Sequence, residues 1–245
     1  MSKKILVISP IPSHPQNAGN RARAYSLLLN LKEMWHDIYF LHIKQEIGHD
    51  ESMQLCWGDK FYSIPYKEPK TAAKRHYPKR FYAKIIRKIQ SLILSEQLFT
   101  YSIDDWYDQS VNETIINISN QISPDVVIVE YVFYSKALEL FNKNILKIID
   151  THDKFTDRYK LYKKNKQTPL FFSTKSEQEI KGLNRADIVI SIQQKETNWF
   201  RTKLNQQQIV TVGHLVALHS NNFHNFQNTI LFIGSINPIY IHGIN

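Results

Sequence analysis

The sequence contains little cysteine and little glycine. Its single cysteine, Cys56, excludes an intramolecular disulfide framework and a cysteine-rich zinc site, and we expect it to be an inert, half-buried residue. The 7 glycines among 245 residues are less than half of the usual share of about 7%. In keeping with this, no G-x-G-x-x-G fingerprint, phosphate-binding P-loop or H-E-x-x-H zinc motif occurs.

Long apolar runs are lacking as well. The first run, Ile5–Ile8, stops at Ser9-Pro10 and is shorter than the ~7–15 apolar residues of a signal-peptide core. No window reaches the ~18 apolar residues that indicate a transmembrane helix. We therefore expect a soluble, cytoplasmic protein.

Acidic residues are outnumbered. The chain has 31 Lys and Arg against 22 Asp and Glu, which makes its formal net charge +9. Such a charge suits an anionic membrane surface, a nucleic acid or an acidic substrate. Because helix-turn-helix and RNP patterns are missing, we expect no nucleic-acid partner. The length and the 42% hydrophobic share fit a globular chain with a sizeable core.

Short apolar runs alternate with segments of helical periodicity. Most runs are continuous, as in strands buried on both faces of a parallel sheet. They are Ile5–Ile8, Ile38–Leu41, Val126–Val129, Ile145–Ile149, Ile188–Ile192, Ile209–Val212 and Ile230–Ile233. Helices are expected around Ala24–Leu31, from a capping box at Ser176–Glu179 to Arg185, and over Gln193–Lys203. The alternation predicts an α/β fold with a Rossmann-like, doubly wound parallel sheet, whose ligands lie outside the carboxyl ends of the strands.

The positive charge is concentrated in one segment, Lys67–Lys88, which holds nine basic residues and one acid, Glu68. Apolar residues fall at helical spacing in and after its second half. A basic amphipathic helix is typical of a membrane surface, with Lys84, Arg87 and Lys88 as contacts. The alternative is a solvated helix that packs its apolar face on the domain.

The last residues indicate the start of a second domain. Residues 219–228 are polar and rich in His and Asn, like a linker, and a new apolar strand with a Gly234-Ser235 turn follows. We interpret residues 1–218 as the Rossmann-like domain and 229–245 as the first strand of an incomplete second domain. The alternative is a last strand that joins the same sheet.

Two strand ends carry candidate site residues. The loop after the first strand ends at Ala18-Gly19, where backbone N–H groups and a helix N-terminus favour an anion. Arg21 and Arg23 offer bidentate contacts to phosphate. A plain strand–helix loop is the alternative.

The second strand end carries Asp150-Thr151-His152-Asp153. A histidine among carboxylates suits proton transfer near neutral pH. The alternatives are a helix cap by Asp153 and a histidine held in a core hydrogen bond. We expect no metal, because no second cluster has ligand spacing. His214 follows another strand and is a candidate for the same crevice.

Five stretches, taken in order, resemble the N-terminal half of a GT-B glycosyltransferase of the retaining family 4. They are Lys4–Pro10 with Ala18–Arg21, Pro124–Tyr131, Ile149–Asp153, Leu183–Gln193 and Leu231–Pro238. The resemblance covers nearly the whole chain. It implies two Rossmann-like domains that face each other across a cleft, with the acceptor on the first, the nucleotide sugar on the second, and neither a metal nor a cofactor.

By position, the resemblance implies that His152 and Asp153 lie beside the transferred sugar as catalytic residues. The implied acceptor-binding residues are Gly19, Asn20, Arg21, Glu130, Tyr131 and Arg158. The implied donor-binding residues are Gly19, His214, Gly234 and Ser235. The implied partners are a nucleotide sugar, a glycan or lipid-linked acceptor, the anionic inner membrane surface and a separate C-terminal half.

The predicted function is sugar transfer in bacterial-type surface polysaccharide synthesis, in the cytoplasm and peripheral to the inner membrane. The second, nucleotide-sugar-binding domain is represented only by residues 229–245, so we expect this chain to be incomplete as an enzyme. We expect it to be a fragment, a disrupted reading frame or half of a split enzyme. The alternative is a non-catalytic Rossmann-like module that binds an acceptor or a membrane.

Overall fold

The computed structural model of the chain describes residues 1–68, 100–164 and 171–215. All of these fall within one compact unit that spans residues 1–215. The basic segment beyond Glu68, the linker 219–228 and the predicted last strand lie outside the described residues. The same holds for the candidate residues Lys84, Arg87, Lys88, Gly234 and Ser235.

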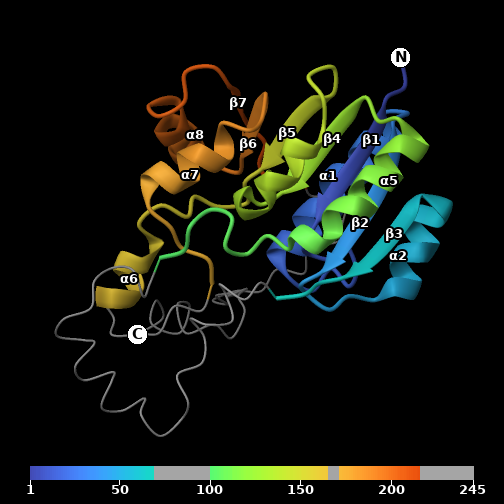
Figure 1. Ribbon diagram of the computed structural model, residues 1–245, viewed down its shortest axis with the longest axis horizontal. Helices are drawn as coiled ribbons and strands as arrows, with labels where there is room; N and C mark the ends of the chain where they lie inside the picture. The colour runs from blue at the N-terminus through green and yellow to red at the C-terminus, as the bar shows by residue number, and fades with distance from the viewer. Residues whose placement is uncertain (69–99, 165–170, 216–245) are drawn as a thin grey trace, which may run out of the picture. The chain divides into compact units, whose positions relative to one another are not determined.

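The unit is built on a seven-stranded sheet in the order β3-β2-β1-β4-β5-β6-β7, and every neighbouring pair is parallel (Figure 1). The strands are β1 (Lys4–Ser9), β2 (Asp37–Lys44), β3 (Phe61–Pro65), β4 (Val126–Glu130), β5 (Leu146–Asp150), β6 (Ile188–Ser191) and β7 (Gln208–Thr211). The predicted Rossmann-like, doubly wound fold is confirmed. Sequence periodicity missed β3, because this edge strand has only partly buried side chains and no continuous apolar core run.

Helices cover both faces of the sheet because alternate strand residues point to opposite sides. In β1, Leu6 and Ile8 belong to the larger core, which includes α5 (Asn112–Ile122) and the 3-10 helix η4 (Val132–Leu140). Ile5 and Val7 belong to a second core, with residues of α1 (Gly19–Glu33) and α2 (Asp50–Trp57). The remaining described helices are η1 (Gly58–Lys60), η3 (Gln109–Val111), α6 (Arg158–Lys164), α7 (Ser176–Leu183) and α8 (Gln194–Arg201).

The predicted capping box at Ser176–Glu179 is wrong in its contacts, although α7 begins at Ser176. The residue at the N-cap position is Lys175, and no side chain caps the helix. Glu179 instead accepts hydrogen bonds from the backbone N–H groups of Phe155 and Thr156. The Glu179 carboxylate, which the local pattern assigned to the start of α7, thus accepts from two N–H groups that are distant in sequence. The helix also stops at Leu183, short of the predicted Arg185.

The strand order reverses between β1 and β4, which defines the topological switch point of the sheet. The chain after β1 continues into α1 on one face and returns at β2, whereas the chain after β4 continues into η4 on the other face and returns at β5. Ligands of open α/β sheets bind in the crevice that these diverging connections leave at the carboxyl ends. Among the described residues, no helix is both long and apolar enough to span a bilayer.

Candidate functional site

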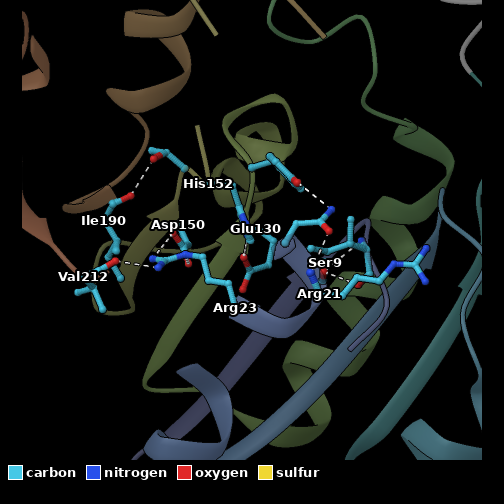
Figure 2. Close-up of polar contacts among 12 residues, drawn as sticks. Ser9, Arg21, Arg23, Glu130, Asp150, His152, Ile190 and Val212 are labelled. Atoms are coloured by element: carbon cyan, nitrogen blue, oxygen red, sulfur yellow. Dashed lines mark hydrogen bonds and ion pairs between the residues drawn. The ribbon is translucent and has the colours of Figure 1, made fainter. Parts of the chain in front are cut away.

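A buried histidine–carboxylate pair lies at the carboxyl ends of β4 and β5. Glu130 is the last residue of β4 and is opposite Asp150, the last residue of β5. His152 follows two residues later, and its Nε2 is hydrogen-bonded to Oε2 of Glu130 (Figure 2). The exposed fractions are 4% for His152 and 0% for Glu130, and no described residue forms a hydrogen bond with Oε1 of Glu130. The pair is therefore shielded from bulk water.

Tyr131 supports the imidazole from one face. Its ring stacks on that of His152, with 4.3 Å between the ring centroids. Its hydroxyl accepts a hydrogen bond of 3.1 Å from Nδ2 of Asn20, in the first turn of α1. The backbones of Tyr131 and His152 both have positive φ, 70° and 57°. Such φ values are unfavourable for these residue types and persist only where the surroundings enforce them.

Asp150 forms a buried ion pair with Arg23 of α1. Nε and Nη2 of Arg23 lie 3.1 and 3.0 Å from the two carboxylate oxygens, and the residues are 2% and 0% exposed. Nη1 of Arg23 donates to the carbonyls of Val212 and Gly213, at 2.7 and 2.9 Å (Figure 2). Four of the five N–H groups of the buried Arg23 guanidinium are thus bonded within the protein, and the sequence-based expectation that it contacts phosphate is wrong.

The charges around His152 decide its protonation. Burial alone lowers the pKa of His152, but the carboxylates of Asp150 and Glu130 outweigh it and hold the pKa above its ordinary value. Burial raises the pKa of Glu130, and the contact with His152 offsets part of that increase. Both members hold protons more tightly than usual. One proton lies between Nε2 and Oε2, whichever atom carries it, so the pair is suited to donating or sharing a proton.

Two carboxylates and one imidazole of this site lie close enough together to resemble a metal site. Glu130, Asp150 and His152 each offer one atom within 4.8 Å of the others. Both oxygens of Asp150, however, bond the Arg23 guanidinium, and Nε2 of His152 bonds Glu130. A cation would compete with a guanidinium that is already in place, and the site uses this internal cation as its counter-charge.

Residues 151–153 form the corner that follows β5, and Asp153 is its solvent-accessible residue. Its side chain is 43% exposed and its Oδ2 lies 3.3 Å from Nη1 of Arg158, in an ion pair at the surface. The structure therefore brings Asp153 and Arg158 together beside the buried pair. A ligand that approaches from solvent meets the Asp153 carboxylate more readily than His152.

The start of α1 also lies at the carboxyl ends of the strands, after β1. An added Cβ at Gly19 would meet nothing within 4 Å, so the protein's own packing does not require glycine there. Asn20 reaches Tyr131, whereas Nη2 of Arg21 lies 3.0 Å from Oε2 of Glu46. Gly19 and Asn20 are thus joined to the site around Tyr131, and Arg21 is held to one side by Glu46.

His214 is exposed and follows the Val212–Gly213 carbonyls that Arg23 binds. No contact of its side chain with the buried pair is found among the described residues. Sequence reasoning missed the roles of Arg23, Glu179 and Glu196, because their partners lie 127, 24 and 42 residues away. Charged residues that fall on the buried side of a helix are the signal that could have found them.

No protein-family model and no curated protein sequence matches the chain. Among solved structures, MurG of Acinetobacter baumannii is 9% identical with a TM-score of 0.44, over 89% of this chain and 47% of that one. Sucrose-phosphate synthase of Thermosynechococcus elongatus is 12% identical with a TM-score of 0.48, over 86% and 48%. UDP-GlcNAc 2-epimerase of Methanocaldococcus jannaschii is 10% identical with a TM-score of 0.45, over 86% and 45%. The chain spans about half the length of these proteins.

Proposed function

We propose that the chain is the acceptor-side half of a GT-B glycosyltransferase of family 4. It would act in the transfer of a sugar from a nucleotide sugar to a glycan or lipid-linked acceptor. The observation that carries the proposal is the shielded His152–Glu130 pair at the carboxyl ends of β4 and β5, beside the switch point of the sheet. The order of the sequence motifs that resemble this family supports it independently. The structural likenesses above are too distant to contribute.

The transfer breaks the bond between the sugar's anomeric carbon and the diphosphate, and it forms a bond from that carbon to an acceptor oxygen. The diphosphate leaves with the electron pair, and the proton of the acceptor hydroxyl passes to the departing diphosphate. The His152–Glu130 pair is suited to hold a proton against a sugar or acceptor oxygen. Asp153 supplies an exposed carboxylate that accepts hydrogen bonds from sugar hydroxyls.

The first turn of α1 is suited to the diphosphate. Backbone N–H groups at a helix N-terminus attract negative charge, and the absence of a side chain at Gly19 leaves room for close approach. Retention of configuration and independence from metal are parts of the proposal that rest on the family resemblance. So does the role in surface polysaccharide synthesis at the inner membrane face.

The proposal is tested by titrating the chain with a panel of nucleotide sugars in a calorimeter and by following nucleoside diphosphate release. If the chain acts as an enzyme by itself, at least one sugar should bind at micromolar to millimolar affinity and be hydrolysed or transferred. His152→Ala should lower that turnover by about 10²- to 10⁴-fold, the usual contribution of a proton-transferring group. His36→Ala is the matched control, because His36 lies just before β2, at the amino ends of the strands and away from the site.

Absence of binding across the panel would contradict an independent enzymatic role. Binding of glycan or lipid-linked acceptors without any turnover would instead favour the non-catalytic module.

A further inference from the structure

Two buried carboxylates hold three consecutive backbone N–H groups just after the His152–Asp153 corner. Oε1 and Oε2 of Glu179, on α7, accept from the N–H groups of Phe155 and Thr156 at 2.8 and 2.6 Å. Oε1 of Glu196, on α8, accepts from the N–H of Lys154 at 3.1 Å. Two helices that are separate in sequence thus direct their carboxylates at one short segment.

Burying these two carboxylates costs free energy, and the N–H groups of the segment offset that cost. Glu179 is 0% exposed and Glu196 is 7% exposed, and burying an ionised carboxylate is strongly unfavourable without compensating donors. Burial raises the pKa of both carboxyls, and their backbone donors act in the opposite direction. Hydrogen bonds from N–H groups to a carboxylate are among the stronger ones in proteins. The compensation for both glutamates comes mainly from residues 154–156.

The segment is attached to the strained residue of the site. His152 has a φ of 57°, and its predecessor Thr151 is fixed to β6, because both its N–H and its hydroxyl donate to the carbonyl of Ile190 (Figure 2). After His152, the backbone N–H groups of residues 154–156 donate hydrogen bonds to Glu179 and Glu196. The left-handed residue is therefore anchored before and after.

We propose that Glu179 and Glu196 are positioning residues that hold the corner at His152 in its left-handed conformation, so that the imidazole faces Glu130. They act through residues 154–156 and do not touch the reacting atoms. The catalytic meaning of this role rests on the proposed function, whereas the positioning itself does not.

The test compares three glutamine variants of nearly unchanged size. Glu179→Gln retains one acceptor oxygen, but its amide nitrogen cannot accept the second N–H. Glu196→Gln keeps an acceptor oxygen for the Lys154 N–H but removes its charge, which weakens this single bond. Glu177→Gln, at an exposed position of the same helix, is the matched control.

The first readout is hydrogen exchange of the Phe155 and Thr156 amides, which reports on the local attachment. The second is the NMR signal of the His152 ring proton that is hydrogen-bonded to Glu130, which a merely structural role would leave in place. In Glu179→Gln, both the amides and the ring proton are expected to exchange at least about tenfold faster, whereas Glu177→Gln should match the wild type.

The proposal is overturned if the His152 ring-proton signal and its exchange stay unchanged in Glu179→Gln and Glu196→Gln while the amides exchange faster. If Glu179→Gln does not fold, Glu196→Gln decides by the same criteria. No sugar is needed for these measurements. Failure of the positioning role is thus distinguishable from failure of the proposed sugar transfer.

Discussion

The ring of Tyr131 lies nearly flat on the imidazole of His152, with the ring planes 24° apart and the centroids 4.3 Å apart. Each residue lies just beyond the carboxyl end of its strand, and the two strands are neighbours in the sheet. Each also has positive φ, a conformation that costs about 1–2 kcal/mol for residues of this kind. Two such costs at neighbouring strand ends support the proposal that the placement of these rings serves function.

Replacing Glu130 should lower the pKa of His152. The Glu130 carboxylate is one of the two negative groups that raise that pKa, so Glu130→Gln should reduce it. Titration of the histidine ring signals by NMR measures the change. Glu113→Gln, at an exposed position of α5, should leave the midpoint where it is.

The same pair makes stability depend on pH. Since the folded-state pKa of His152 lies above the ordinary 6.5, its contribution to the free energy of unfolding is complete below pH 6.5 and is lost as pH rises through the folded-state pKa. Glu130, whose pKa is also raised, acts in the same direction from pH 4.5 upward. Urea unfolding at several pH values should show this decline in the wild type and a smaller one in Glu130→Gln. Equal slopes would contradict the coupling.

Removing the Arg23 guanidinium should strongly destabilise the protein. Arg23→Met leaves the buried Asp150 carboxylate without its partner, which typically costs about 3–5 kcal/mol of unfolding free energy. Lys44→Met breaks the exposed pair with Asp50 and should cost about 1 kcal/mol or less. Denaturant unfolding of both variants checks the contrast. Similar losses in the two would mean that the Asp150–Arg23 pair contributes little.

Gly19 and Gly48 should respond oppositely to a methyl group. Gly19→Ala meets no atoms and should leave stability unchanged or raise it slightly, while weakening any ligand that approaches the start of α1. In Gly48→Ala, the new Cβ would lie 2.3 Å from Cβ of Pro12, and overpacking should cost about 1–3 kcal/mol. Thermal unfolding and calorimetry with a bound nucleotide sugar measure both effects. Unchanged affinity in Gly19→Ala would place the ligand elsewhere.

His42 should make the protein sensitive to acid. Burial lowers its pKa to about 4 and outweighs the nearby Asp50 carboxylate, which acts in the opposite direction. Because the unfolded chain binds this proton near pH 6.5, stability is lost as pH falls below that value, by about 2 kcal/mol at pH 5. His42→Leu should remove this part of the acid sensitivity, which unfolding at pH 5 and pH 7.5 would reveal. An unaltered difference between the two pH values would show that another group is responsible.

The sheet was predictable because parallel strands that are buried on both faces leave continuous apolar runs. The runs at Ile5–Ile8, Val126–Val129 and Ile188–Ile192 correspond closely to β1, β4 and β6. The edge strand β3 escaped because its side chains are only partly buried. The position of His152 at a strand end was predictable for the same reason as the strands themselves.

The partners of the site residues were not predictable, because they depend on which strands become neighbours. Glu130 and His152 meet only because β4 and β5 pair in register. Arg23 appeared free for phosphate until the fold brought Asp150 beside it. Glu179 fitted a local capping pattern, but its actual partners are the backbone N–H groups of Phe155 and Thr156 rather than the start of its own helix.

The most direct test of the ligand site is an amide NMR titration of the chain with a panel of glycan acceptors and nucleotide sugars. Shift changes are expected to be concentrated at Gly19, Tyr131, His152 and Asp153, with little change at His36, at the amino end of β2. Shift changes confined to other regions, or none at saturating concentration, would contradict a glycosyl-transfer site at the carboxyl ends of β4 and β5.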